Sequence, residues 1–281
     1  MVRYVMAIRE EMTDSPEHHR NRSEFIRKMV QRCSLTALDD RYRQGPPKTI
    51  VQFWHDVRAL PKDVEDCVAS WTRWKTSGFV HRLFDADGAK AFIGGSLDAR
   101  HERAFERCYH PAMQADYFRL CYLLVEGGFY VDADDVCVGA QISWLFEDGR
   151  LKIQPLCYDI ASGTMVNQPE YIHNDACNSN WIYYFNNNPL VVARGHPVIE
   201  RALQQATNIL ERACGDELPE IQATTGPGNL SKSIFELGTA SGDVERSIVV
   251  LRDWDSCAVS RWPLSYRDDA RNWRLCNRRR L

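Results

Sequence analysis

Short β-rich runs alternate with helical patterns from residue 49 onwards, and this alternation limits the fold more than any other feature. Residues 49–54 and 79–84 are apolar, β-rich and short enough to be buried strands. A helical pattern at residues 61–75 separates them, and helical segments follow at 88–93 and 96–108. Strands that alternate with helices are typical of an α/β fold with a largely parallel sheet. We therefore predict a mostly parallel central sheet flanked by helices.

One further helix is expected to lie in the interior. Pro111 marks its start and Gly127-Gly128 marks its end, which are the places that these residues favour in helices. Apolar residues recur within it at i, i+3, i+4 and i+7, and they also occupy its remaining faces. Residues 129–131, which follow the two glycines, are the next expected strand.

The rest of the chain is less periodic. Residues 140–190 are rich in Asn, Asp and aromatics, so we expect irregular structure or short strands there. Helices are expected at 198–214 and 231–237, and a late strand at 248–251. The charged N-terminal part has an amphipathic pattern at 23–38, and Gly45-Pro46-Pro47 ends it. We predict a helical N-terminal extension over residues 1–45 and a single domain over residues 46–281.

Composition narrows the class of partner. The formal net charge is −3, and the basic residues are spread along the chain apart from a short run at 278–280, which argues against nucleic acid. No apolar run reaches the length of a transmembrane helix or a signal peptide. The ten cysteines lack metal-binding spacing, so we expect free thiols, no zinc site and a cytoplasmic location.

Two Asp-x-Asp triplets are candidates for chemistry. Asp132-Ala133-Asp134 follows the apolar run 129–131, and in an extended chain its two carboxylates would point the same way. Paired carboxylates at the carboxyl end of a strand suit a hard divalent cation, Mn²⁺ or Mg²⁺, held against phosphates. The twin triplet Asp85-Ala86-Asp87 opens an apparent helix, which helix N-capping explains.

The surroundings of Asp132-Ala133-Asp134 distinguish it from its twin. Asp116 and Arg119 precede it on the buried helix, and Gly127-Gly128 and Tyr130 lead into it. This arrangement resembles the DXD sugar-transferase family, which includes the yeast initiating α-mannosyltransferases and the glucosyltransferase domains of the large clostridial toxins. Residues 47–54, Gly195-His196-Pro197 and Thr225-Gly226-Pro227-Gly228 are similar to further family landmarks. The resemblance implies a Rossmann-like GT-A fold for residues 46–281.

The resemblance also implies roles for individual residues. Asp134 would bind the metal directly and Asp132 through water or on the donor ribose, with Asn272 of Asn272-Trp273 as the nearest match to a third ligand. Asp132, Asp134 and Arg119 would be the catalytic residues. The implied contacts with the donor are Trp54, Asp116, Arg119, Tyr130, Asp132 and Asn187. From the residues alone, Asp116 and Arg119 could equally form an i, i+3 ion pair, Trp54 could be a core residue, and Asn186 or Asn188 could stand for Asn187.

The implied function is a metal-dependent retaining glycosyltransferase. It would move a hexose from a nucleotide-diphosphate sugar, with UDP favoured over GDP-mannose, to an unidentified acceptor such as a glycan, a protein or a small molecule. Two alternatives remain open from the sequence. One is a haloacid-dehalogenase-like phosphatase that uses Asp85 and Asp87, and the other is a non-catalytic sugar-nucleotide binder.

Overall fold

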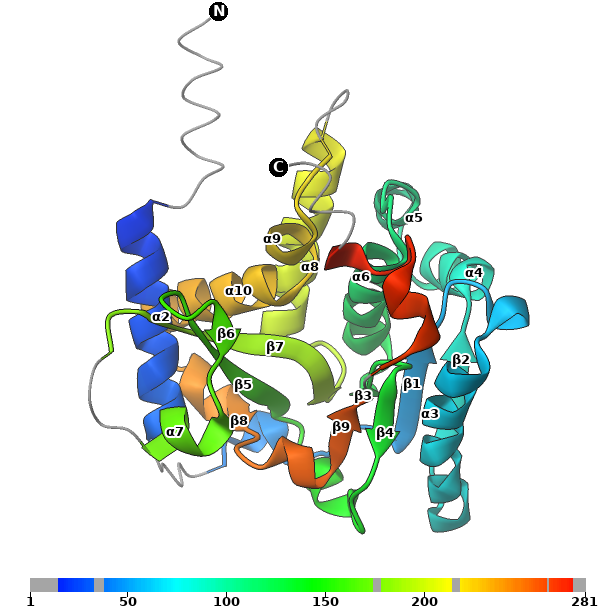
Figure 1. Ribbon diagram of the computed structural model, residues 1–281, viewed down its shortest axis with the longest axis horizontal. Coiled ribbons are helices and arrows are strands. Elements are labelled where there is room, and N and C mark those ends of the chain that lie inside the picture. The colour runs from blue at the N-terminus through cyan, green and yellow to red at the C-terminus, as the bar shows by residue number, and fades with distance from the viewer. Residues whose placement is uncertain (1–14, 33–37, 174–177, 214–217, 262, 275–281) are drawn as a thin grey trace, which may run out of the picture.

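A computed structural model describes residues 15–32, 38–173, 178–213, 218–261 and 263–274. Its centre is a sheet of seven strands in the order β2-β1-β3-β7-β5-β6, with β8 beside β5 (Figure 1). The strands are β1 (Thr49–Phe53), β2 (Val80–Phe84), β3 (Gly128–Tyr130), β5 (Leu151–Asp159), β6 (Thr164–Met165), β7 (Trp181–Val192) and β8 (Ile248–Val250). A separate pair consists of β4 (Asp135–Cys137) and β9 (Ala258–Ser260).

The predicted α/β architecture is confirmed. The helices are α2 (Pro16–Gln31), α3 (Lys62–Thr72), α4 (Ala86–Ser96), α5 (Ala99–Glu106), α6 (Pro111–Val125), α7 (Gln168–His173), α8 (Pro197–Arg212), α9 (Ile221–Thr224) and α10 (Pro227–Ser241). The strand pairings make β1, β2, β3, β5 and β8 run in one direction, whereas β6 and β7 run in the other. The sheet is therefore mostly parallel in direction, with β7 antiparallel to both of its neighbours.

Two hydrophobic clusters cover the two faces of the sheet. Alternate residues of a strand point to opposite faces, so Val51 and Tyr130 enter one cluster while Ile50 and Phe129 enter the other. The first cluster includes buried residues of α2, α4, α5, α6, α8 and α10, and the second includes Trp71 of α3 together with residues of β4 and β9. The buried helix predicted between Pro111 and the two glycines is α6.

The turn from α6 into β3 requires both glycines. Gly127 and Gly128 have φ values of +69° and +113°, which residues with a Cβ rarely adopt. A Cβ on Gly127 would lie 2.6 Å from the backbone nitrogen of Arg194, and one on Gly128 would lie 3.0 Å from the carbonyl oxygen of Thr49. The Gly-Gly pair thus fixes how closely α6 and β3 approach their neighbours, and so where the strand ends.

The region 140–190 departs from the expectation of irregular structure or short strands. It contains all of β5, which has 9 residues, and most of β7, which has 12. These are the two longest strands of the sheet. Their apolar residues are interrupted by Gln154, Asn186 and Asn188, which face a cleft and hide the alternation of apolar and polar residues. The prediction was wrong for β5 and β7 because the polar residues along these two strands were counted as loop signals.

The N-terminal helix α2 begins and ends earlier than the pattern at 23–38 predicted. Ser15 caps it, and Ile26, Met29 and Val30 bury against the main core beside β7 and α10. The division at residue 45 stays a prediction. No helix among the described residues has the length and hydropathy needed to cross a membrane. The basic run 278–280 lies outside the described residues.

We predict that the buried His196 makes the stability of the folded protein decrease at acid pH. Its Nδ1 accepts from the backbone nitrogen of Val198 to cap α8, and its Nε2 donates to the carbonyl oxygen of Ser247 at 3.1 Å. Burial lowers the pKa of His196 to about 4. In the unfolded chain this histidine becomes protonated below about pH 6.5, whereas in the folded protein it stays neutral down to about pH 4. The free energy of unfolding therefore falls as the pH is lowered from about 6.5 to about 4.

We expect His196→Asn to remove this sensitivity, because Asn can cap a helix but does not titrate. Urea unfolding at a series of pH values should show the wild type losing up to about 3 kcal/mol more than the variant between pH 7 and pH 4. Parallel curves for the two proteins would contradict a neutral, buried His196.

Candidate functional site

The triplet Asp132-Ala133-Asp134 lies in a tight turn between β3 and β4, not in an extended chain as the sequence reasoning assumed. The backbone nitrogen of Asp135 donates to the carbonyl oxygen of Asp132 at 3.2 Å, which closes the turn. Ala133 is buried in one hydrophobic cluster with Trp54. Asp132, Asp134 and Asp135 all line the cleft, but Asp135 is almost fully buried and the other two are partly exposed.

Asn188 holds this turn in place. Strand β3 ends at Tyr130, opposite Leu190, but β7 continues beyond it. There the Asn188 side chain takes over the pairing: its Oδ1 accepts from the backbone nitrogen of Asp132 at 2.9 Å, and its Nδ2 donates to Asp135 at 2.8 Å. The position of the DXD turn thus depends on one amide side chain of a neighbouring strand.

Arg119 is the central cation of the site. Its guanidinium lies 2.8 Å from both Asp116 and Asp132 and donates to the carbonyl oxygen of Asn187 at 2.6 Å. It also lies over the ring of Tyr130, 4.3 Å from the centroid. Burial alone would lower the pKa of Arg119, but the carboxylates of Asp132 and Asp116 raise it above its ordinary value. Arg119 therefore stays charged inside the protein.

Asp116 is held by residues from three parts of the chain. Asn187 donates to its Oδ1 at 2.8 Å, and the Thr225 hydroxyl lies 3.5 Å from its Oδ2. Gly226 packs against the same carboxylate, since a Cβ there would lie 3.3 Å from Oδ2. Burial raises the pKa of Asp116 despite the nearby Arg119. Of the three consecutive asparagines, Asn187 is the one whose side chain donates to Asp116, and its role as a donor contact stays a prediction.

The pKa of Asp135 is raised further than that of Asp132. Ser260 Oγ donates to Asp135 at 2.6 Å, and burial together with the charges of Asp134 and Asp132 raises its pKa to about 7. Burial, opposed by Arg119, likewise raises the pKa of Asp132 to about 6. We read Asp135 as a structural residue that ties β4 to β9.

The C-terminal segment reaches the DXD turn from the opposite side of the cleft. Tyr266 Oη donates to Oδ2 of Asp134 at 2.6 Å, and the Arg267 guanidinium lies 2.5 Å from the same oxygen. The carbonyl oxygen of Ala270 contacts Nε2 of His110 at the start of α6, so the segment crosses beside that helix (Figure 1). Asp134 is therefore oriented by residues more than a hundred positions away.

Asn272 lies in this same segment and lines the cleft. Its Nδ2 donates to the carbonyl oxygen of Arg267 at 2.6 Å, and its Oδ1 accepts from the backbone nitrogen of Arg274 at 3.1 Å. Among the described residues it makes no hydrogen bond with Asp132 or Asp134. Its role as a metal ligand stays a prediction.

These residues line a cleft of about 610 Å³, within the usual size of small-molecule sites. Trp54, Asp116, Arg119, Asp132, Asp134, Asn187 and Asn272 all contribute to its wall. Trp54 is 8% exposed, packs edge-on against Tyr266, and has an indole nitrogen without a hydrogen-bond partner in the described part of the chain. Tyr130 is fully buried and does not line the cleft, although its hydroxyl also lacks a partner among the described residues.

The donor set fits a hard divalent cation. Oδ2 of Asp132 and Oδ1 of Asp134 accept no hydrogen bond from the described residues, and carboxylate oxygens are the ligands that Mn²⁺ and Mg²⁺ prefer. The ion pairs of these carboxylates in the described part of the chain are those of Asp116 and Asp132 with Arg119 and that of Asp134 with Arg267. A preformed cluster of three or more acidic, His or Cys ligands is absent from the described residues.

The twin triplet has the structural role that the sequence suggested. Oδ1 of Asp85 accepts from the backbone nitrogen of Gly88 at 2.7 Å and caps α4. Neither Asp85 nor Asp87 lines the cleft.

Residues 59–149 match the family model described as glycosyltransferase sugar-binding region containing DXD motif. This segment is thus similar to a glycosyltransferase sugar-binding region that contains a DXD motif. It contains Asp116, Arg119 and the DXD turn, whereas Trp54, Asn187 and Asn272 lie outside it. No curated protein sequence matches the chain. The solved structure of PaToxG Glycosyltransferase is 14% identical with a TM-score of 0.46, covering 80% of this chain and 79% of that one.

Four residues that hold the candidate site together were not identified from the sequence: Asn188, Ser260, Tyr266 and Arg267. The nearest signal was the run Asn186-Asn187-Asn188, which was read as an ambiguity in register. The structure shows three separate roles for it, because Asn186 contacts Gln154, Asn187 contacts Asp116 and Asn188 contacts Asp135. Nothing in the local sequence marks Tyr266 or Arg267.

Proposed function

We propose that this protein is a metal-dependent, retaining hexosyltransferase that uses a nucleotide-diphosphate sugar, with UDP preferred. The observation that carries the proposal is the DXD turn, whose two cleft-facing carboxylates each keep an open oxygen beside Arg119 and Asp116. A cation bound by these oxygens supplies charge neutralisation of the departing diphosphate. The expected manganese or magnesium dependence and the cytoplasmic location belong to this proposal.

Different residues of the cleft would bind different parts of the donor. Asp116 and Asn187, which are already joined by a hydrogen bond, would bind the hydroxyls of the donor sugar. Arg119, fixed by two carboxylates, would stabilise the negative charge that develops on the leaving group. Trp54 would contact the nucleobase, which is supported by its place in the cleft wall and its unsatisfied indole nitrogen.

Retention would follow from a front-face substitution. The acceptor oxygen bonds to the anomeric carbon on the side from which the diphosphate leaves, and the acceptor proton passes to the released diphosphate. The side chains of the protein would then need only to position the donor and the acceptor and to stabilise the charge on the leaving diphosphate. Tyr130 would not touch the donor. Its ring would instead stabilise the position of the Arg119 guanidinium, which lies over it.

The test is nucleotide release from a panel of UDP- and GDP-sugars with and without Mn²⁺. We expect slow release of UDP, by hydrolysis in the absence of an acceptor, that depends on Mn²⁺ or Mg²⁺. Release that is unaffected by EDTA would contradict metal dependence. Binding of the donor without any release would instead support the non-catalytic sugar-nucleotide binder.

A further inference from the structure

A second group of polar side chains lines the same cleft away from the donor residues. Asn186 of β7 donates to Gln154 of β5 at 3.2 Å, and Gln154 donates in turn to Oδ1 of Asp255 at 3.3 Å. Asp255 lies in the turn Trp254–Ser256, which follows β8. The chain of hydrogen bonds ends on a carboxylate whose Oδ2 accepts no hydrogen bond from the described residues. None of these side chains contacts Asp116 or Arg119.

The group lies one step along the strand from the DXD turn. Asn186 and Asn188 are two residues apart on β7, so they are separated by about 7 Å. Asn188 contacts both Asp132 and Asp135, and the turn that carries Asp255 runs directly into β9, whose Ser260 also contacts Asp135. A molecule bound at Gln154 and Asp255 would therefore lie next to the position where the donor sugar is expected.

An apolar wall borders the polar group. Leu156 and Tyr184 are directly paired across β5 and β7, and the Tyr184 hydroxyl donates to the sulfur of Met165 at 3.5 Å. All three residues line the cleft. The same face continues outwards to Tyr158 and Ile182, which are paired with each other and are 36% and 41% exposed. One side of this region thus offers polar groups and the other offers an apolar surface.

We propose that Gln154, Asn186 and Asp255 form the acceptor subsite and that the acceptor is a carbohydrate whose apolar face lies on Leu156, Met165 and Tyr184. A sugar presents hydroxyls that both donate and accept, which two amides and one carboxylate satisfy, and a C–H face that packs on apolar side chains. Asp255 accepts a hydrogen bond from an acceptor hydroxyl and positions the sugar. As the new bond from the acceptor oxygen to the anomeric carbon forms, the bond to the diphosphate breaks and the hydroxyl proton leaves with the diphosphate.

This inference rests on the proposed function, and hydrolysis of the donor separates the two. Water can replace the acceptor in hydrolysis, so hydrolysis reports the donor site, whereas transfer requires the acceptor subsite as well. The probes are p-nitrophenyl α- and β-hexopyranosides, added to the protein with Mn²⁺ and the UDP-sugar that is hydrolysed fastest. Transfer is measured as glycosylated product and hydrolysis as free hexose.

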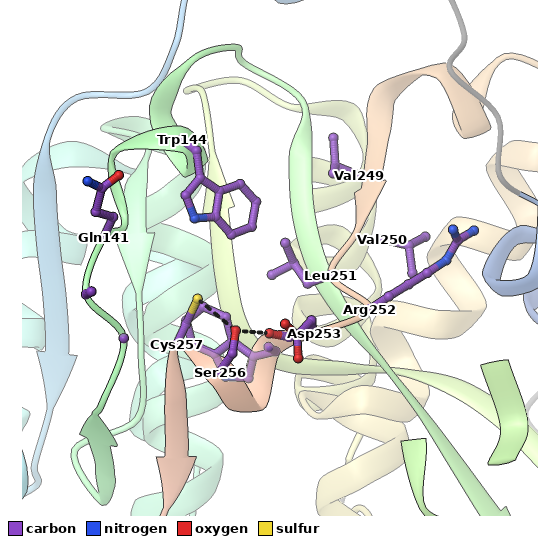
Figure 2. Close-up of a pocket in the computed structure, with 12 residues that line it drawn as sticks. Gln141, Trp144, Val249, Val250, Leu251, Arg252, Asp253, Ser256 and Cys257 are labelled. Atoms are coloured by element: carbon purple, nitrogen blue, oxygen red, sulfur yellow. Dashed lines mark hydrogen bonds between the residues drawn. The ribbon is translucent and has the colours of Figure 1, made fainter. Parts of the chain in front are cut away.

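The matched control is Asp253, two residues before Asp255 in the same turn. Asp253 lines a different cavity, together with Trp144, Leu251 and Cys257 (Figure 2). We expect Asp255→Asn to lower the ratio of transfer to hydrolysis at least about tenfold, since a hydrogen bond to a charged group is lost. Asp253→Asn should leave that ratio within about twofold of the wild type.

Three results would overturn the proposal. The first is an equal ratio of transfer to hydrolysis in the two variants. The second is hydrolysis that continues while none of the aryl glycosides is glycosylated, which would leave the donor site intact but remove the carbohydrate acceptor. The third is glycosylation of a Ser- and Thr-containing peptide and of no aryl glycoside. Absence of any nucleotide release would instead contradict the proposed function itself.

Discussion

Replacing Asp134 by Asn is expected to reduce metal-dependent nucleotide release by roughly a thousandfold or more, because neutralisation of the leaving diphosphate is worth several kcal/mol. Asp134 offers one oxygen to the cleft while Tyr266 and Arg267 hold the other. The variant keeps the shape of the side chain and loses its charge, so the fold should survive. The measurements are release of UDP and the affinity for Mn²⁺, both of which should fall.

Asp132→Asn should act in the same direction, while the twin triplet supplies the matched control. Asp85→Asn keeps a residue that caps helices well, and Asp85 does not line the cleft, so activity and stability should change little. The haloacid-dehalogenase alternative predicts the reverse, with activity lost in Asp85→Asn and kept in Asp134→Asn. The pair of variants therefore decides between the two chemistries.

Replacing Arg119 by Met is expected to destabilise the protein by about 3–5 kcal/mol, because it leaves buried carboxylates without a counter-charge. The side chain of Arg119 is 3% exposed and that of Asp116 is 12% exposed, so water cannot replace the lost cation there. The contact with Tyr130 and the hydrogen bond to the carbonyl oxygen of Asn187 are lost as well. Urea unfolding at neutral pH measures the change.

The control is Arg201, whose ion pair with Glu236 lies at the surface with 41% of the Arg201 side chain exposed. Arg201→Met should cost less than about 1 kcal/mol. Equal losses of stability in the two variants would show that the buried carboxylates find other compensation. Arg119→Lys should not restore activity fully, because an ammonium cannot reproduce the planar fork that contacts two carboxylates and a carbonyl at once.

Asp116, Arg119 and the two DXD carboxylates could be identified as candidate site residues because they are close in the sequence. Asp116, Arg119 and the DXD turn fall within one helix, one turn and one strand, and the two glycines between them need positive φ values that mark the turn. The spacing of residues along a helix and a strand indicates which side chains share a face, so a segment of about 20 residues is enough to identify these candidates. The same spacing argument overreached for Asp132 and Asp134, since it assumed an extended chain where the structure has a turn.

The residues of the proposed acceptor subsite, and those that contact Asp134, could not be predicted in this way. Tyr266 and Asp134 are separated by 132 positions, and Gln154 and Asp255 by 101. Their side chains meet only because β7 and β5 extend past the end of β3 and because the C-terminal segment crosses beside α6 (Figure 1). No local pattern encodes a contact of that kind.

The sequence by itself determined the alternation of strands and helices, the glycine turn before β3 and the identity of the DXD carboxylates, because each depends on the conformation of neighbouring residues. Only the tertiary structure decided that Asn188 holds the DXD turn, that Tyr266 and Arg267 orient Asp134, and that Asp255 shares the cleft. These contacts form when distant segments pack together, and the burial that holds them there depends on the whole fold.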